Sequence, residues 1–561
     1  MKLRITQLDL PPGYTLEQLL KAVAKALRCD PSTLSHLQTI RRSIDARGRS
    51  PRMMLTVEVD LSGKLRNGLR NVEKAKVVER AVSPSVKNYS GPRPLVVGAG
   101  PAGLMAAFAL AEAGLNPLLI ERGEAAASRA KRVESFWKDG TLNVESNVLY
   151  GEGGAGLFSD GKLTSRSKDR PRVRRLLEIF VAGGASPDIL IDAEPHIGSD
   201  VLEELLPALR NRIIELGGEV RFDARLDRLE IENGAVRGAV ISGEEFSTDC
   251  CVLATGHSAR DIYEMLAEQG VQLEPKGFAV GVRLEIPQHR IDTTQWGGSF
   301  PMLGKASFRL TRREEENARS CYTFCMCPGG LVMSCASSEG LLTTNGMSLS
   351  ARDKPMGNAA FLVPVFPADF PVVGQASPVP RGACVGGGHA LLDTGSASYN
   401  ALGGSASYNA LAGIKFQKKL EEAAFVAGGS DYSLPAQRLV DFLEGASPSE
   451  LPEIRSCTRA VPAQLRGLLP EFVEHTLRNA VPKMLRSMRG VVLDEALLYA
   501  SETRSSSPVR IVRGDDGQST GVRGLYPCGE GAGYAGGIVS SGIDGLRQAE
   551  AVIGKTNNKI S

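Results

Sequence analysis

The sequence predicts an α/β fold in which a discontinuous Rossmann-like domain brackets an α+β cap domain and follows a small α+β module. Three observations predict this arrangement. The residues from Leu95 onward have the order strand, glycine-rich turn, helix and strand that is typical of a Rossmann unit. A second short strand, glycine-rich turn and helix occupy residues 524–554. The intervening residues 266–497 are irregular in pattern and rich in turns.

Residues 1–82 are predicted to form the small N-terminal module, which is basic. Strands are expected at residues 2–8, 37–45 and 53–60, and an amphipathic helix at 15–27. Residues 1–93 carry 18 lysines and arginines against 8 acidic residues. This excess is compatible with a solvated face, or with docking of a protein partner, of nucleic acid or of a membrane surface. The scarcity of interleaved aromatic residues disfavours single-stranded nucleic acid.

Composition sets the remaining boundaries. Residues 83–94 are rich in Pro, Gly and Ser and are predicted as a linker. The Rossmann-like domain is expected over residues 95–265 and again over 498–561, on either side of the cap domain. Its first part is predicted to contain a helix over 200–216 behind Ser199 as N-cap, and a strand meander over 219–256 with a hairpin at Asn233 and Gly234.

The cap domain contains a near-perfect tandem repeat, SASYNALGG at 396–404 and SASYNALAG at 405–413. Two such copies are too few for a solenoid, so we expect a duplicated loop. A helix is predicted after it, near residues 411–427.

The first glycine-rich turn has the spacing of a dinucleotide-binding site, Gly98-x-Gly100-x-x-Gly103. The first glycine makes the turn, the second lets the backbone approach a pyrophosphate, and the third lets helix and strand pack closely. The N-terminus of the following helix supplies unpaired N–H groups for the phosphates. Glu121 ends the second strand, 18 residues after Gly103, where a carboxylate can accept from a ribose hydroxyl.

Two later segments favour FAD over NAD as the dinucleotide. VLATG (252–256) and LYPCGE (525–530) resemble the elements with which flavoproteins of the two-dinucleotide-binding-domain type return to their cofactor. Glu530 stands where those proteins usually carry Asp, and its longer side chain makes a direct ribityl contact harder to infer. Gly536, Gly537 and Ile538 open a helix whose N–H groups are expected to face the flavin pyrimidine edge and stabilise negative charge there.

Residues 95–561 resemble a family of uncharacterised bacterial FAD-dependent dehydrogenases, and the N-terminal module also occurs in that family. The matching segments are GEGGAGLFSDGKL (151–163), TFCMCPGG (323–330), NGMS (345–348), ETRSSSPVRI (502–511) and CGEGAGYAGGIVSSGIDG (528–545). The region from about Val373 to Ala410 looks like an insertion. The resemblance implies bound FAD and redox chemistry, but no particular substrate.

These motifs predict a set of cofactor contacts. The predicted FAD-binding residues are Gly98, Gly100, Ala102, Gly103, Glu121, Arg122, Gly154, Gly156, Ser159, Asp160, Thr255, Gly256, Glu530, Gly537 and Ile538. Because no His or Cys lies in an obvious flavinylation context, we expect noncovalent FAD. No second strand–GxGxxG–helix unit is evident, so NAD(P)H, if it is the electron donor, is expected to bind transiently.

Three residues are candidates for catalysis. Lys162, beside Ser159 and Asp160 in the glycine-rich segment 151–163, is predicted to lie near the flavin N1/C2 edge and favour the anionic reduced ring, although a surface turn is the alternative. His257 follows the ATG element and is a possible acid or base, although a hydrogen-bonded structural role is more common for such a residue. Arg504 is a possible clamp for an anionic substrate or, equally, an interdomain salt link.

Cys321, Cys325 and Cys327 raise the question of a metal or redox centre. Their spacing is not usual for zinc, and no fourth thiolate or His lies at a conventional distance, so we predict no metal site. Strand alternation would put Cys325 and Cys327 on one face as small buried residues. A thiol near the flavin is the alternative.

The leading functional hypothesis is an FAD-dependent dehydrogenase or reductase that passes hydride between flavin N5 and a small organic substrate. The alternatives are a flavin monooxygenase and a flavoprotein whose basic module docks RNA or a protein partner. The N-terminal residues lack the apolar stretch of a secretory signal, and the charge-free run 94–111 is broken by glycines and short for a membrane span. Ten cysteines without an evident disulfide framework suit a reducing compartment, so we expect a cytoplasmic location.

Overall fold

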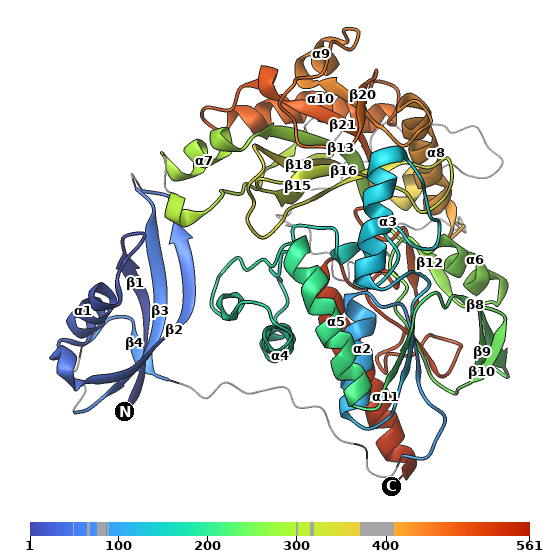
Figure 1. The fold of residues 1–561 in the computed structure, drawn as a ribbon, viewed down its shortest axis with the longest axis horizontal. Helices are drawn as coiled ribbons and strands as arrows, with labels where there is room; N and C mark the ends of the chain where they lie inside the picture. The colour runs from blue at the N-terminus through green and yellow to red at the C-terminus, as the bar shows by residue number, and fades with distance from the viewer. Residues whose placement is uncertain are drawn as a thin grey trace.

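The computed structural model describes residues 1–48, 50–63, 68–75, 86, 89–298, 301–314, 319–370 and 409–560. The described residues form an N-terminal module, a Rossmann-like domain and a cap domain (Figure 1). Within these parts of the chain, every helix is too short or too polar to span a lipid bilayer.

The N-terminal module is a four-stranded antiparallel sheet covered by one helix. Its elements are β1 (Lys2–Leu10), α1 (Leu16–Leu27), β2 (Leu34–Asp45), β3 (Arg52–Leu61) and β4 (Val72–Lys74), with strand order β2-β3-β1-β4. Thr15 caps α1 in a capping box with Gln18. The predicted helix and strands are confirmed, whereas β4 was missed because its three residues carry no periodic signal.

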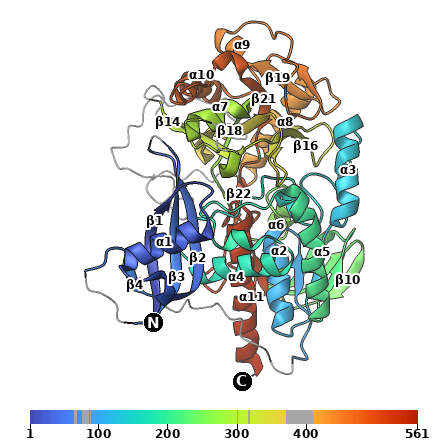
Figure 2. The ribbon, with the colours of Figure 1, turned by 60° about the vertical axis from the view of Figure 1, so that its left-hand side comes forward.

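Several basic side chains of this module form ion pairs within the protein. Lys2 and Arg4 both pair with Glu58, and Arg52 pairs with Asp9. Arg42 binds Asp192 at 2.7 Å, which ties β2 to the Rossmann-like domain on the side of α4 (Figure 2). Glu58 and Asp9 already count among the 8 acidic residues of this part of the chain, so of these pairs only that of Arg42 with Asp192 reduces the excess of positive charge.

The Rossmann-like domain is built on a five-stranded parallel sheet of order β23-β11-β5-β6-β7. These strands and the helices on one face are β5 (Leu95–Val97), α2 (Pro101–Glu112), β6 (Leu118–Ile120), α5 (Ser199–Glu215), β7 (Glu219–Arg221), β11 (Cys251–Leu253), β23 (Leu525–Pro527) and α11 (Ile538–Ile560). Figure 1 shows α2, α5 and α11 side by side. Alternation decides the two faces: Val96 packs toward these helices, whereas Leu95 and Val97 pack toward the opposite side.

The other elements of this domain flank the sheet. They are α3 (Ala126–Asp139), α4 (Arg170–Ala182), β8 (Leu226–Glu232), β9 (Ala235–Ile241), β10 (Glu244–Ser247), α6 (Arg260–Glu268), β12 (Leu273–Pro275) and β22 (Val509–Ile511). The hairpin at Asn233 and Gly234 is confirmed, and both residues have positive φ. The N-cap prediction was wrong: Gly198 is the N-cap of α5, and Ser199 is its first residue, with its hydroxyl donating to the Ser159 carbonyl.

The cap domain is a seven-stranded sheet of order β14-β15-β18-β13-β21-β19-β20 with helices against it. Its elements are β13 (Phe278–Pro287), α7 (Gln288–Trp296), β14 (Thr311–Arg313), β15 (Ser320–Cys327), β16 (Leu331–Cys335), β17 (Thr343–Met347), β18 (Met356–Val365), α8 (Ala412–Ala427), β19 (Leu434–Arg438), α9 (Leu439–Glu444), β20 (Ala460–Pro462), α10 (Glu471–Arg486) and β21 (Leu497–Glu502). Predicted helix 411–427 is α8, while most of the tandem repeat lies outside the described residues. The cap sheet begins at Phe278 and ends at Glu502, since β12 pairs with β22 in the Rossmann-like domain.

A buried ion cluster joins the two large domains. Glu421 on α8 of the cap binds Arg260 on α6 at 2.8 and 2.9 Å and Arg504, just after β21, at 2.8 and 2.9 Å. The Glu421 side chain is fully buried. Burial by itself raises the pKa of Glu421, but the two guanidinium groups outweigh it and hold the pKa well below its ordinary value.

Replacing Glu421 with Gln is expected to lower the melting temperature of the protein. The change leaves two buried guanidinium groups without their counter-charge, a defect that typically costs about 3–5 kcal/mol. Glu422→Gln, on the exposed side of the same helix turn, is the matched control. Equal thermal unfolding midpoints for the two variants, measured by circular dichroism, would contradict the role given to the cluster.

Candidate cofactor and substrate site

The turn between β5 and α2 needs its glycines for two different reasons. A Cβ on Gly98 would lie 2.5 Å from the Ala254 carbonyl oxygen, and one on Gly103 would lie 1.8 Å from the Gly98 oxygen. Gly98 also has φ +99°. Gly100, by contrast, has φ −77°, and a Cβ there would have its nearest neighbour, the Gly154 Cα, 3.8 Å away. Gly98 and Gly103 are thus required by packing, while Gly100 leaves room for a ligand beside the backbone.

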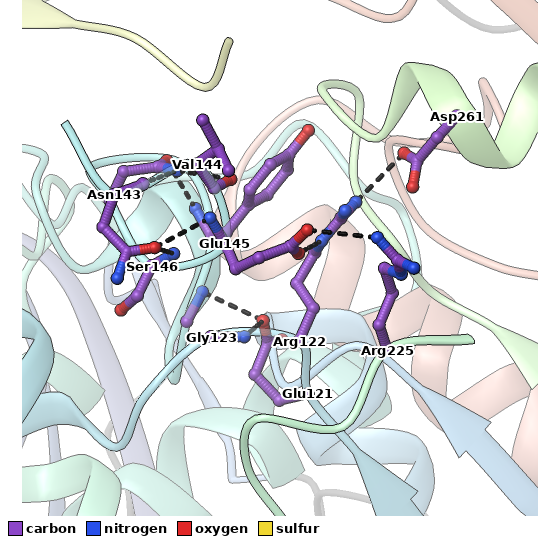
Figure 3. Close-up of polar contacts among 12 residues, drawn as sticks. Glu121, Arg122, Gly123, Asn143, Val144, Glu145, Ser146, Arg225 and Asp261 are labelled. Carbon is purple, nitrogen blue, oxygen red and sulfur yellow. Dashed lines mark hydrogen bonds and ion pairs between the residues drawn. The ribbon is translucent and has the colours of Figure 1, made fainter. Parts of the chain in front are cut away.

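Glu121 lies at the end of β6 and accepts hydrogen bonds from three backbone N–H groups, of which Figure 3 labels that of Gly123. One carboxylate oxygen accepts from Ala99 at 2.8 Å, and the other accepts from Gly123 at 3.0 Å and Gly151 at 2.9 Å. A carboxylate offers about four lone-pair sites, so one remains for a hydroxyl donor. Glu121 therefore fits a ribose hydroxyl while holding the turn and the segment 151–163 together.

Arg122, the next residue, is engaged with protein acceptors. Its guanidinium binds Glu145 at 2.6 Å and Asp261 at 3.0 Å, and it lies over the Tyr150 ring (Figure 3). Arg225 reaches the same Glu145 at 3.3 Å. These contacts connect the end of β6 to α6, and the predicted contact of Arg122 with the cofactor stays a prediction.

The segment 151–163 lies directly against the phosphate-binding turn. The Gly153 N–H donates to the Ala99 carbonyl at 2.8 Å, and a Cβ on Gly154 would lie 3.1 Å from the Gly100 Cα. A Cβ on Gly156 would lie 3.3 Å from the Ile538 side chain, at the start of α11. The segment thus passes from the turn to the N-terminus of the C-terminal helix.

Arg129 on α3 fixes the beginning of this segment. Its fully buried guanidinium donates to the carbonyl oxygens of Asn147, Val148, Glu152 and Gly154, all at 2.7 to 2.8 Å. Burial lowers the pKa of Arg129 to about 9, an effect that the nearby Glu121 and Glu152 oppose. Arg129 therefore remains cationic at neutral pH and satisfies carbonyls that the chain turn would otherwise leave unpaired.

The late segments meet at the same edge of the sheet. Gly531 approaches the Gly256 carbonyl oxygen so closely that a Cβ there would lie 2.4 Å from it. Among the described atoms, none lies within 4 Å of a Cβ built on Gly256, Gly536 or Gly537. Together with Gly100, these positions outline a cradle with open space on its backbone. Because α11 begins at Ile538, its first N–H groups point toward this cradle.

The structure thus brings most of the predicted FAD-binding residues together at the carboxyl ends of the parallel strands. Ala102 and Gly103 lie in the first turn of α2, and Thr255 follows β11 beside Gly256. The open glycine positions and the spare site on Glu121 fit the pyrophosphate and a ribose of a dinucleotide.

Glu530 is a titratable group beside this cradle. Burial raises its pKa to about 7, and the Lys276 ammonium partly opposes that rise. Lys276 itself donates to Ser506 at 2.7 Å. Glu530 therefore exchanges a proton near neutral pH, unlike an exposed carboxylate.

The three candidate catalytic residues have different surroundings. His257 bonds to the Ser258 hydroxyl at 2.8 Å, and burial, aided by Arg504 and Arg260, lowers its pKa to about 4, so the ring is neutral at pH 7. Arg504 pairs with Glu421, which also binds Arg260 of α6, so Arg504 takes part in a salt link at the domain junction, in keeping with the second of its two predicted roles. The Lys162 ammonium lies 3.3 Å from Asp160, and Asp160 also binds Arg352 of the cap domain. Ser159 donates to the Gly156 carbonyl and so braces the segment internally.

The cysteine segment departs from regular alternation. The pairing of β15 with β18 shifts register between Phe324 and Cys327, and Cys325 has φ +46°. This bulge interrupts the strand alternation from which a shared face for Cys325 and Cys327 was expected. Burial raises the pKa of both thiols, and the described residues contain no cluster suited to a metal ion.

Arg352, which binds Asp160, was not predicted from the sequence, because no motif distinguishes it from other arginines.

Comparison with known proteins identifies the family. A protein-family model described as "FAD-dependent protein, C-terminal domain-like" matches residues 277–378 and 398–505. A second family model, described as "FAD binding domain", matches residues 93–154. A domain of unknown function matches residues 2–60. An uncharacterized protein from Clostridium beijerinckii is 38% identical over 566 residues, 99% of each chain. The chain belongs to a family of uncharacterised FAD-dependent oxidoreductases. The predicted family and its FAD cofactor are therefore confirmed.

Solved flavoproteins are similar to this FAD-dependent oxidoreductase only loosely. Glycine oxidase from Bacillus cereus is 11% identical, covers 83% of this chain and 95% of its own, and has a TM-score of 0.29. A variant of E. coli quinol fumarate reductase is 12% identical, covers 84% and 71%, and has a TM-score of 0.36. Such distant likenesses transfer neither a site nor a substrate.

Gly100→Ala is expected to weaken FAD binding about tenfold or more while the protein still folds. The methyl group fits the backbone geometry of the free protein but intrudes where the pyrophosphate approaches, and each lost bond to a charged group is worth about 1.5–3 kcal/mol. Gly554→Ala in α11, where a Cβ also meets no described atom, is the control. Flavin content after gel filtration and fluorescence titration with FAD measure the effect. Wild-type affinity in Gly100→Ala would remove Gly100 from the cradle.

Proposed function

We propose that this FAD-dependent oxidoreductase is a dehydrogenase or reductase that acts on a small organic substrate held between the Rossmann-like and cap domains. Bound FAD supplies hydride transfer at N5. The protein holds the cofactor noncovalently, positions the substrate and stabilises charge.

One observation supports this assignment above the others. The segment 151–163 runs from the phosphate-binding turn, where Gly154 meets Gly100, past Ile538 to Asp160, which binds Arg352 of the cap. Gly100 and Gly154 would hold one part of a cofactor bound along this segment, and the cap domain near Arg352 would limit the access of water to the reacting part.

The remaining predicted residues take roles in keeping with their surroundings. The glycines of the cradle and Glu121 would hold the dinucleotide, and the N-terminus of α11 would stabilise negative charge on the flavin ring. His257 is neutral and bonded, and Arg504 is paired, so we assign both to positioning the domain junction rather than to proton transfer.

Anaerobic reduction of the purified protein tests the proposal. We expect a flavin absorption spectrum, release of FAD on denaturation, and bleaching near 450 nm by substrates or donors, including NADH and NADPH, on the order of a flavin equivalent per chain. The Gly100→Ala protein serves as the flavin-depleted control.

The reoxidation step distinguishes a dehydrogenase from a monooxygenase. A dehydrogenase or reductase is expected to reoxidise slowly in air, with oxygen uptake independent of substrate. Rapid oxygen consumption that requires the substrate and yields a hydroxylated product would contradict the proposal and favour the monooxygenase.

A further inference from the structure

A polar cluster lies where the segment 151–163 meets the cap domain, and it consists of Asp160, Lys162, His196 and Arg352. The Asp160 side chain is 1% exposed and accepts from Arg352 at 3.1 and 2.6 Å. Lys162 lies 3.3 Å from the same carboxylate. An antiparallel bridge pairs Lys162 with His196, so their side chains leave the backbone on the same side.

The cluster has hydrogen-bond donors left over. The Lys162 ammonium is shielded from solvent yet makes no hydrogen bond within the described parts of the chain, and the same holds for Nδ1 of His196. Arg352 gives two of its five N–H donors to Asp160, and its second terminal nitrogen has no described acceptor. Shielding the Lys162 ammonium and the His196 ring nitrogen from water without a hydrogen-bond partner is unfavourable. These donors therefore indicate an acceptor that comes from a ligand.

The charge of the cluster limits what that ligand is. Asp160 neutralises one of the two cations, Lys162 and Arg352. Burial and the nearby Arg352 lower the pKa of His196 to about 4, so its ring is neutral at pH 7. One positive charge remains, which matches a monoanion, whereas a phosphate dianion would leave uncompensated negative charge in a partly buried site.

The two domains fix the cluster jointly. Ser350 in the cap binds the Asp200 carboxylate at 2.7 Å through its N–H group, and the Ser348 N–H approaches the Ser159 carbonyl at 3.4 Å. Gly329 lies so close to the Arg352 carbonyl oxygen that a Cβ there would be 1.9 Å from it. Close packing against Gly329, in the segment 328–330, thus positions Arg352, whereas the Rossmann-like domain positions Lys162.

We propose that Lys162, Arg352 and His196 bind a carboxylate group of the substrate, so that the enzyme acts on organic acids. The proposal rests on the function proposed above and deepens it. The carboxylate accepts from the Lys162 ammonium and from the free end of the Arg352 guanidinium, and the neutral His196 ring donates a further hydrogen bond. The remainder of the substrate then extends toward the flavin along the segment 151–163.

Paired ligands test this proposal on the FAD-loaded protein. A panel of small organic acids, including acetate, succinate and benzoate, is titrated beside the corresponding neutral amides and inorganic phosphate. Binding is followed by calorimetry and by perturbation of the flavin spectrum. We expect acids to bind at least tenfold more tightly than their amides and phosphate to bind weakly.

Variants locate the binding to the cluster. Lys162→Met is expected to lose about 10- to 100-fold in affinity for the acids, the range of a charge-assisted hydrogen bond, while FAD content and flavin reduction potential stay at wild-type values. Lys162→Arg is expected to recover part of the affinity. Lys168→Met, an exposed lysine six residues further along, is the matched control.

Each outcome decides for or against the cluster. Equal binding of acids and amides, or wild-type acid binding by Lys162→Met, overturns the proposal. A changed flavin potential in Lys162→Met with acid binding intact assigns Lys162 to the flavin instead. If the protein is not reduced by any donor, the proposed reaction fails, but calorimetry with the acids still tests the site by itself.

Discussion

The cofactor site depends on how the backbone of one glycine-rich segment is held. Glu121 accepts a hydrogen bond from the Gly151 N–H group, and Arg129 donates to the carbonyl oxygens of Asn147, Val148, Glu152 and Gly154. An anion and a cation thus satisfy opposite polar groups of the same stretch of chain, which has no regular ladder of its own. Glu121 also holds the Ala99 N–H, so one carboxylate sets the distance between the segment and the phosphate-binding turn.

Charged side chains also hold the domain junction together, and there they are buried as ion pairs. Glu421 binds Arg260 and Arg504 in a fully buried cluster, and Asp160 binds Arg352 at a second point of the interface. Burying these charges is unfavourable unless each finds a partner. In the observed arrangement of the domains, Glu421 and Asp160 each pair with a guanidinium group from the other side of the junction. This arrangement brings the cap segment 345–352 onto the loop 159–163.

The sequence predicts the local parts of this site well. The spacing of Gly98, Gly100 and Gly103 and the acidic end of β6 reflect backbone requirements that few residue types meet, and Thr15 and Asn233 mark a helix start and a hairpin for the same reason. Long-range pairings are different. Arg352 and Asp160 are 192 residues apart, and no local pattern distinguishes this arginine from others. The bulge at Cys325 and the first-turn position of Ser199 likewise depend on tertiary contacts, which override alternation and capping preference.

A buried cation becomes informative only when its donors are counted. Arg283, in the centre of the cap sheet, gives its five N–H donors to Glu502, Asn345, Asn358 and the Cys325 carbonyl, so its charge belongs to the fold. Lys162 acts electrostatically on Cys325 as Arg283 does, but its ammonium has an ion pair with Asp160 and no hydrogen bond within the described residues. Burial alone would not separate the two. A shielded cation with unpaired donors is unfavourable in the free protein, and binding of an anion removes that penalty. The same unpaired donors therefore lower the stability of the free site and raise its affinity for an anionic ligand.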